Sequence, residues 1–275
     1  MFFATFIWGS IPLFSIWTNL PSPIFVFFRV LFAFPFIFFY SLRKLGKKEL
    51  IKVRPVFPLV LSGIALSLNW IFFFWAINIT DITTAVVLYY FGPVFSIILA
   101  VIFLKEPLTN TLLLATILAF FGAFLTFYPS FSQSSASFLG SLIALISGFL
   151  YGLLGFISKI ATMKHSSLKV TVYQIFISIF FTAPFVFFFK FELNFMVLFL
   201  LIVTGIVHTA LALFLWYDSL NYIRVSTSAV FSYLDPFFAI ILGFVFLNQK
   251  PSLIQLIGGI LIAASGVAIS IEEKG

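Results

Sequence analysis

The sequence predicts an all-α protein that crosses a membrane many times, and three observations support this prediction. Of the 275 residues, 63% are hydrophobic and 8% are charged, whereas a soluble domain is about 45–50% apolar and about 25% charged. The apolar residues form long stretches, and a helix needs about 20 of them to cross a bilayer. A weak internal repeat relates the two halves of the chain at a constant spacing of 143 residues. We therefore expect a polytopic membrane protein with ten transmembrane helices, arranged as two inverted five-helix repeats.

The predicted spans are residues 2–18, 23–41, 57–76, 82–104, 111–128, 138–159, 168–189, 196–217, 224–247 and 252–271. The connections between them are short and leave no room for a soluble domain. The fourth and ninth spans each carry a central proline, Pro93 and Pro236. A proline removes a backbone hydrogen bond and kinks a membrane helix. We expect these two prolines to act as hinges, with static kinks as the alternative.

Basic residues predict the orientation, because cytoplasmic loops of membrane proteins are rich in Lys and Arg. Six basic residues lie between Arg43 and Arg54, after the second span, which places this connection in the cytoplasm. Of the basic residues in the other connections, only Lys190 and Lys250 then face outward. We expect a multi-pass protein of the plasma membrane with both termini in the cytoplasm. This distribution explains the net charge of +7 without a nucleic-acid partner.

The internal repeat is clearest around the two prolines, where residues 82–104 align with residues 225–247. The matched residues include Gly9 with Gly152, Trp8 with Tyr151, Tyr90 with Tyr233 and Pro93 with Pro236. Because each half has an odd number of spans, the halves enter the membrane from opposite sides, as in many secondary transporters. The predicted repeats are residues 1–128 and 138–272.

These features resemble a known family. Each half has an aromatic residue and a glycine in its first span, a Ser- and Thr-rich start to its proline-containing span, and a Gly-rich last span. The first half ends its proline-containing span with Leu104-Lys105-Glu106. The pattern resembles the drug/metabolite transporter superfamily, specifically its EamA-type ten-helix members. The second half departs from the pattern, because Gln249 stands where an acidic residue is usual and Asp235 precedes the proline.

The resemblance implies a secondary transporter that moves small organic metabolites, with amino acids or related compounds as the expected solutes and export as the expected direction. We expect transport without ATP by alternating access. The alternatives are efflux of hydrophobic cations or drugs, and a non-transporting membrane protein for assembly or lipid handling.

Ionisable residues inside the spans are the first candidates for function, because a charge at mid-membrane costs about 2.5–3.5 kcal/mol on insertion scales. We expect Arg29, His208 and Asp235 to serve in charge or proton coupling. As alternatives, Asp235 caps the broken helix, Arg29 extends to the outer headgroups, and His208 is a hydrogen-bonded packing residue. Charged residues at the inner ends of spans are expected to form surface pairs or inner-gate contacts: Lys105, Glu106, Asp218 and Arg224.

Polar and amphipathic residues at mid-membrane depth are the predicted substrate-binding residues. They are Trp8, Asn69, Tyr89, Tyr90, Tyr151, His208, Ser232, Tyr233 and Asp235. Repeat-related members, such as Tyr90 and Tyr233, are expected to line opposite walls of one cavity. The alternative for each residue is ordinary hydrogen bonding between helices. Trp216 lies near the end of its span and is expected to be an interfacial anchor.

Several kinds of chemistry have no signature in the sequence. The chain has no cysteine, and it contains neither a phosphate-binding loop nor an H-E-x-x-H zinc motif. We therefore expect no enzymatic activity, no metal and no cofactor. The expected partners are a small-molecule solute and membrane lipids, and the protein is expected to be a monomer or a homodimer.

Overall fold

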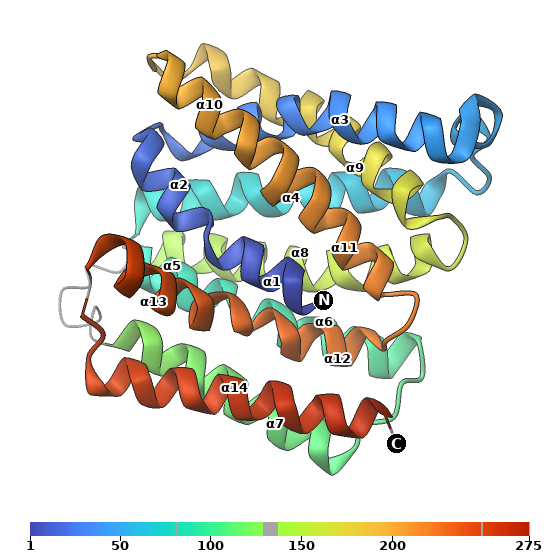
Figure 1. The fold of residues 1–275 in the computed structure, drawn as a ribbon. Helices are drawn as coiled ribbons and strands as arrows, with labels where there is room; N and C mark the ends of the chain where they lie inside the picture. The colour runs from blue at the N-terminus through green and yellow to red at the C-terminus, as the bar shows by residue number, and fades with distance from the viewer. Residues whose placement is uncertain (81, 129–136, 249, 275) are drawn as a thin grey trace.

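The computed structural model describes residues 1–80, 82–128, 137–248 and 250–274, which leaves Gln249 outside the described residues. Helices are the only regular secondary structure in these residues, and they run side by side along one direction (Figure 1). Nine helical stretches in the described part are long and apolar enough to cross a membrane. A shorter apolar stretch, Phe2–Thr18, precedes them. The predicted all-α polytopic fold is therefore confirmed.

The described residues of the first half form seven helices, because two of the predicted spans are broken. They are α1 (Phe2–Gly9), α2 (Ile11–Thr18), α3 (Ser22–Ile51), α4 (Phe57–Ile79), α5 (Ile82–Tyr89), α6 (Gly92–Phe103) and α7 (Asn110–Phe127). The first span was expected to be continuous. It breaks at Ser10 because Pro12 has no backbone N–H to continue the helix across this point.

In its described residues, the second half contains two helices that are not α-helices. Its elements are α8 (Phe138–Thr162), α9 (Ser167–Thr182), the 3-10 helix η2 (Ala183–Phe187), α10 (Phe195–Val203), the π-helix η3 (Thr204–Leu211), α11 (Ala212–Ser219), α12 (Val225–Ser232), α13 (Leu234–Leu247) and α14 (Leu253–Lys274). The eighth predicted span therefore corresponds to α10, η3 and α11 in succession. No pattern in the sequence predicts the π-helix.

Both proline-containing spans are broken at the expected place. The first is divided into α5 and α6, and the second into α12 and α13. Pro93 lies at the start of α6, and Pro236 lies in the first turn of α13. Proline fits this position because the first N–H groups of a helix have no partner within the helix. The action of these breaks as hinges stays a prediction.

Repeat-related glycines make matching contacts between the two halves. A Cβ atom added to Gly9 would lie 2.9 Å from the carbonyl oxygen of Asp235, and one added to Gly152 would lie 2.6 Å from that of Gly92. Asp235 and Gly92 are also separated by the repeat spacing. Each glycine therefore lets the first helix of one half approach the broken helix of the other half. These contacts support the repeat, while its inverted topology stays a prediction.

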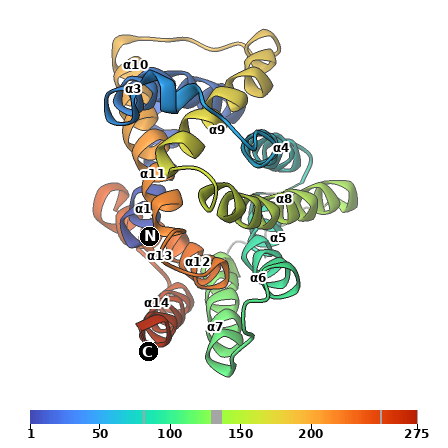
Figure 2. The same cartoon turned by 90° about the vertical axis from the view of Figure 1, so that its right-hand side faces the viewer.

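The two ends of the helix bundle differ in the chain segments that lie there. We call the end at which α3, α6, α8, α11 and α14 finish the terminal face, because both chain termini lie toward it (Figures 1 and 2). The basic residues between Arg43 and Arg54 belong to this face. We call the opposite end, at which α2, α4, α7 and α13 finish, the mouth face.

Candidate functional site

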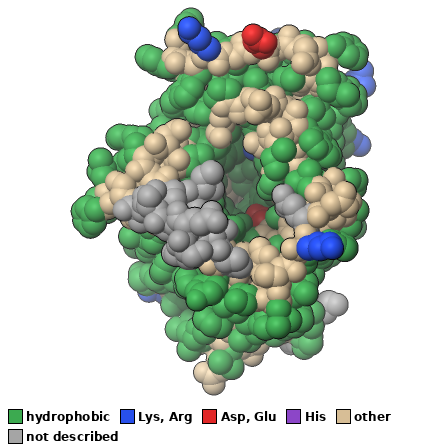
Figure 3. Space-filling model, turned by 90° about the vertical axis from the view of Figure 1, so that its left-hand side faces the viewer, with side chains coloured by type: hydrophobic (Ala, Val, Ile, Leu, Met, Phe, Trp, Pro, Cys, Tyr) green, Lys and Arg blue, Asp and Glu red, His purple; other side chains and the backbone are tan. Residues whose placement is uncertain are grey.

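A cavity of about 360 Å³ lies between helices of both halves. Its volume falls within the range of about 300–1,000 Å³ that is typical of small-molecule sites. The mouth face is hollowed, and an acidic side chain is visible inside the hollow (Figure 3). Among the described residues that line the cavity, Asp235 is the only acidic one. The cavity therefore opens at the mouth face.

The cavity brings together most of the residues that the sequence predicted to bind solute. Those that line it are Trp8, Asn69, Tyr89, Tyr90, Tyr151 and Asp235, whereas His208, Ser232 and Tyr233 do not. Arg29 and Pro236 also line it, and Pro93 does not. The functional roles of all these residues stay predictions.

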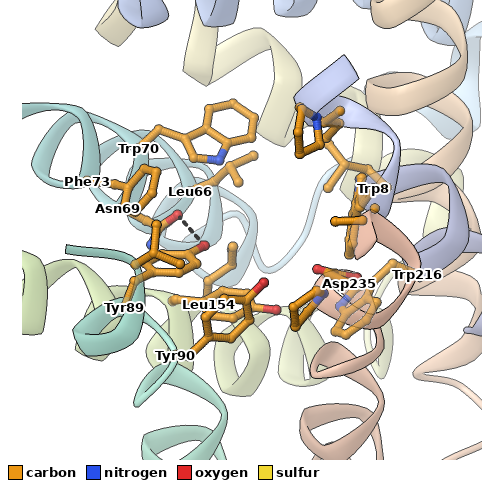
Figure 4. A pocket seen from close by; sticks show the side chains of 18 of the residues that line it. Trp8, Leu66, Asn69, Trp70, Phe73, Tyr89, Tyr90, Leu154, Trp216 and Asp235 are labelled. Atoms are coloured by element: carbon orange, nitrogen blue, oxygen red, sulfur yellow. Dashed lines mark hydrogen bonds between the residues drawn. The ribbon is translucent and has the colours of Figure 1, made fainter. Parts of the chain in front are cut away.

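Aromatic rings contribute to both of the walls that face each other in Figure 4. On one wall, the Tyr89 hydroxyl donates a hydrogen bond of 3.5 Å to Asn69 Oδ1, and its ring stacks on Tyr151 with the centroids 5.0 Å apart. On the other wall, Trp8 packs against Trp216 with the ring centroids 5.1 Å apart. The expectation that Trp216 is an interfacial anchor was wrong, because it is buried and lines the cavity.

Tyr90 and Tyr233 do not lie on opposite walls as expected. Their rings stack on each other with the centroids 5.9 Å apart, and the Tyr233 hydroxyl donates to the Tyr90 carbonyl oxygen at 2.8 Å. Only Tyr90 reaches the cavity, because Tyr233 is fully buried behind it. The repeat-related pair therefore joins the two broken helices instead of facing across the space between them.

Arg29 is a buried cation at the cavity surface. Its Nε donates to Thr209 Oγ1 at 2.9 Å, and its NH2 group donates to the His208 carbonyl oxygen at 3.3 Å. The guanidinium also lies over the Trp70 ring, 5.4 Å from the centroid. Only 7% of Arg29 is exposed, so its side chain does not extend to the headgroup region.

Asp235 is a carboxyl group with no cationic partner among the described residues. Its Oδ1 is buried and has no hydrogen-bond partner in the described part of the chain, and the carboxylate forms no ion pair there. Asp235 lies in the first turn of α13, where the helix dipole favours a negative charge. The cavity thus carries one guanidinium and one carboxyl group, and no ion pair joins them.

His208 lies behind the cavity wall, within η3. Its Nε2 is 2.8 Å from Ser10 Oγ, and its ring packs on Phe14 with the centroids 4.4 Å apart. Its carbonyl oxygen accepts a hydrogen bond of 3.0 Å from Trp8 Nε1. His208 therefore has the contacts of a packing residue that joins η3 to the break between α1 and α2.

The helix α12 closes the bundle toward the terminal face. Residues 225–230 and Ser232 are all buried, so neighbouring helices surround α12. The Glu106 carboxylate, at the end of α6, accepts hydrogen bonds from Val225 N at 2.8 Å, Ser226 N at 2.9 Å and Ser226 Oγ at 2.5 Å. We call these three bonds the α12 clamp.

A second carboxylate supports the same helix end. Glu273 accepts hydrogen bonds from Arg224 N at 3.0 Å and from Thr227 Oγ1 at 2.5 Å, and it forms an ion pair with Arg224 Nε at 3.2 Å. Both acids therefore bind the positive end of the α12 dipole. Arg224 thus forms a charge pair, with Glu273 as its partner, and a role of these contacts as an inner gate stays a prediction.

The described residues include no group of three or more His, Asp or Glu side chains that could hold a metal ion. The lining residues of the cavity offer aromatic faces, one guanidinium and one carboxyl group. Such groups can hold and orient an organic solute, because aromatic faces attract cations and a guanidinium binds a carboxylate through paired hydrogen bonds.

Comparisons with known proteins agree with this arrangement. The model of the EamA-like transporter family matches residues 1–128 and 138–271. The uncharacterized transporter YxxF of Bacillus subtilis (strain 168) is 31% identical over 98% of this chain and 87% of its own length. The S-adenosylmethionine uptake transporter of Rickettsia bellii (strain RML369-C) is 27% identical over 94% of this chain and 86% of its own length.

A solved crystal structure shares the fold. It superposes with a TM-score of 0.86 over 99% of this chain and 96% of that chain, at 16% sequence identity. The sequence relatives are transporters, in agreement with the expectation that this chain is not an enzyme. The match to both halves of the chain shows that the protein belongs to the EamA-like transporter family of the drug/metabolite transporter superfamily.

Proposed function

We propose that the protein is a secondary transporter for a small zwitterionic solute of the amino-acid type. The observation that carries this proposal is the presence of Arg29 and Asp235, unpaired with each other, in one aromatic cavity. The carboxylate of the solute binds the Arg29 guanidinium, and its ammonium group binds Asp235 and the neighbouring aromatic faces. A hydrophobic cation fits less well, because Arg29 repels a positive charge that brings no carboxylate.

The chemistry of the cavity also fits S-adenosylmethionine, which the Rickettsia relatives are named for. This compound combines an amino-acid zwitterion with a sulfonium cation and an adenine ring. The zwitterion would bind Arg29 and Asp235, while the stacked aromatic walls around Tyr89 and Trp216 would receive the adenine. It is therefore our second candidate solute.

The solute crosses the membrane by alternating access. The basic terminal face corresponds to the cytoplasmic side by the distribution of Lys and Arg, so both termini are cytoplasmic and the cavity opens outward in the plasma membrane. The α12 clamp then closes the cytoplasmic side. Export stays our proposed direction from the family resemblance, with the protein acting as a monomer or a homodimer.

Counterflow in proteoliposomes tests this proposal. Vesicles loaded with unlabelled solute are mixed with labelled leucine, phenylalanine or S-adenosylmethionine, and protein-free vesicles serve as the control. We expect saturable uptake of at least one of these solutes. If the folded protein gives no uptake and none of these solutes raises its melting temperature, the transport proposal fails, because a bound solute must stabilise the folded state.

A further inference from the structure

The π-helix η3 packs directly against α3 at the position of Arg29. A Cβ atom added to Gly205 would lie 2.8 Å from Phe32 Cβ and 3.0 Å from the Arg29 carbonyl oxygen. The absence of a side chain at Gly205 therefore permits the close approach of the two backbones. π-Helical turns are rare and occur frequently at functional sites.

The Thr209 hydroxyl, one helical turn after Gly205, links η3 to Arg29. Thr209 is fully buried. Its Oγ1 donates to the Thr204 carbonyl oxygen at 3.3 Å, five residues earlier in η3. Because a hydroxyl has one proton, its use toward Thr204 leaves a lone pair for the bond of 2.9 Å from Arg29 Nε.

The two hydrogen bonds between Arg29 and η3 hold the guanidinium in one orientation and use only some of its N–H donors. Arg29 donates through Nε to Thr209 and through Nη2 to the His208 carbonyl oxygen. A guanidinium has five N–H donors, so these two bonds use only part of them. The remaining donors belong to a side chain that lines the cavity. A guanidinium held in one orientation loses less conformational freedom when it binds a carboxylate.

We propose that Thr209 is a positioning residue for the solute carboxylate, acting by holding Arg29 from the π-helix η3. The inference rests on the proposed function, in which Arg29 binds that carboxylate. In this inference, the cavity prefers amino acids over simple amines because of Thr209, a residue that does not itself line the cavity. Thr209→Val should therefore weaken binding of solutes with a carboxylate and leave solutes without one unaffected.

Competition in counterflow measures this effect. Wild-type protein and each variant are reconstituted, and uptake of labelled leucine is inhibited by unlabelled leucine or by isoamylamine, which is leucine without its carboxylate. For Thr209→Val we expect the inhibition constant of leucine to rise about tenfold, as for a lost hydrogen bond to a charged group. The constant of isoamylamine should stay the same, and Thr209→Ser should restore the wild-type value for leucine.

Thr204→Val is the matched control, because Thr204 is also buried in η3 but its hydroxyl bonds the Leu200 carbonyl oxygen at 2.6 Å. An equal rise in the inhibition constants of leucine and isoamylamine with Thr209→Val, or no rise in either constant, would overturn the inference while leaving the proposed function intact. Absence of any amino-acid uptake by the wild-type protein would instead overturn the proposed function and this inference together. If Thr209→Val does not fold, Thr209→Ala provides the same comparison.

Discussion

Loss of the α12 clamp should shift the protein from the mouth-open state toward the state that opens at the terminal face. The perturbation is Glu106→Gln, which preserves the size of the side chain and removes its charge. The carboxylate accepts three hydrogen bonds of 2.5–2.9 Å from Val225 and Ser226. If the terminal face opens by movement of α12 away from α6, as the proposed alternating access implies, these bonds stabilise only the closed arrangement.

The size of the shift follows from the strength of these bonds. A hydrogen bond to a charged group contributes about 1.5–3 kcal/mol, and glutamine keeps one acceptor oxygen. A net loss of about 2–3 kcal/mol then changes the ratio of the two states about 30- to 150-fold, since about 1.4 kcal/mol corresponds to a factor of ten.

The absence of cysteine from the chain allows introduced cysteines to report this shift. Val86→Cys places a thiol at the cavity, and Ser228→Cys places one in α12, where Ser228 is buried. The rate of maleimide labelling is measured for purified protein in nanodiscs, which leave both faces accessible. With Glu106→Gln, we expect labelling of Ser228→Cys to accelerate at least about tenfold, and labelling of Val86→Cys to slow.

Glu192→Gln is the control, because it makes the same chemical change at an exposed residue far from α12 in the sequence. It should leave both labelling rates unchanged. Unchanged labelling of Ser228→Cys in a folded Glu106→Gln protein would refute the reasoning, because the clamp would then contribute nothing to closure.

Three further predictions concern the cavity and the packing of the two halves. Asp235→Asn should raise the melting temperature, because it replaces a buried carboxyl group that has no ion-pair partner among the described residues, and it should weaken amino-acid binding in the competition assay; a lower melting temperature would contradict the first point. Arg29→Lys should lose the bond to Thr209 and reduce the affinity for leucine about tenfold or more, because lysine lacks the planar donor group. Gly152→Ala should destabilise the protein by about 1–3 kcal/mol in denaturant unfolding, whereas Gly266→Ala should not, because its Cβ would lie 3.7 Å from the nearest atom.

The fold could be predicted largely from the sequence, because its main determinants are local. Apolar stretches of sufficient length predict the spans, and Pro93 and Pro236 predict the breaks before α6 and α13. The break at Ser10 was missed although Pro12 is visible in the sequence. A single proline in a membrane helix is common, and nothing in the repeat marked this one.

The sequence predicted many of the residues that form the site but not how they are arranged. Polar residues at mid-membrane depth were correctly expected to meet, as Asn69 and Tyr89 do. The buried position of Trp216 depends on how α11 packs against α1, which no local pattern encodes. The π-helix that carries Thr209 depends on packing against α3 through Gly205, so its hydrogen bond to Arg29 could be found only in the structure.

The most direct test of the account compares three competitors in wild-type counterflow. Leucine carries both charges, isoamylamine only the ammonium group, and 4-methylpentanoate only the carboxylate. If Arg29 and Asp235 bind opposite ends of one solute, leucine should inhibit uptake of labelled leucine at least about tenfold more strongly than either single-charge analogue. Equal inhibition by isoamylamine or by 4-methylpentanoate would contradict the account, because one of the two charged residues would then take no part in binding.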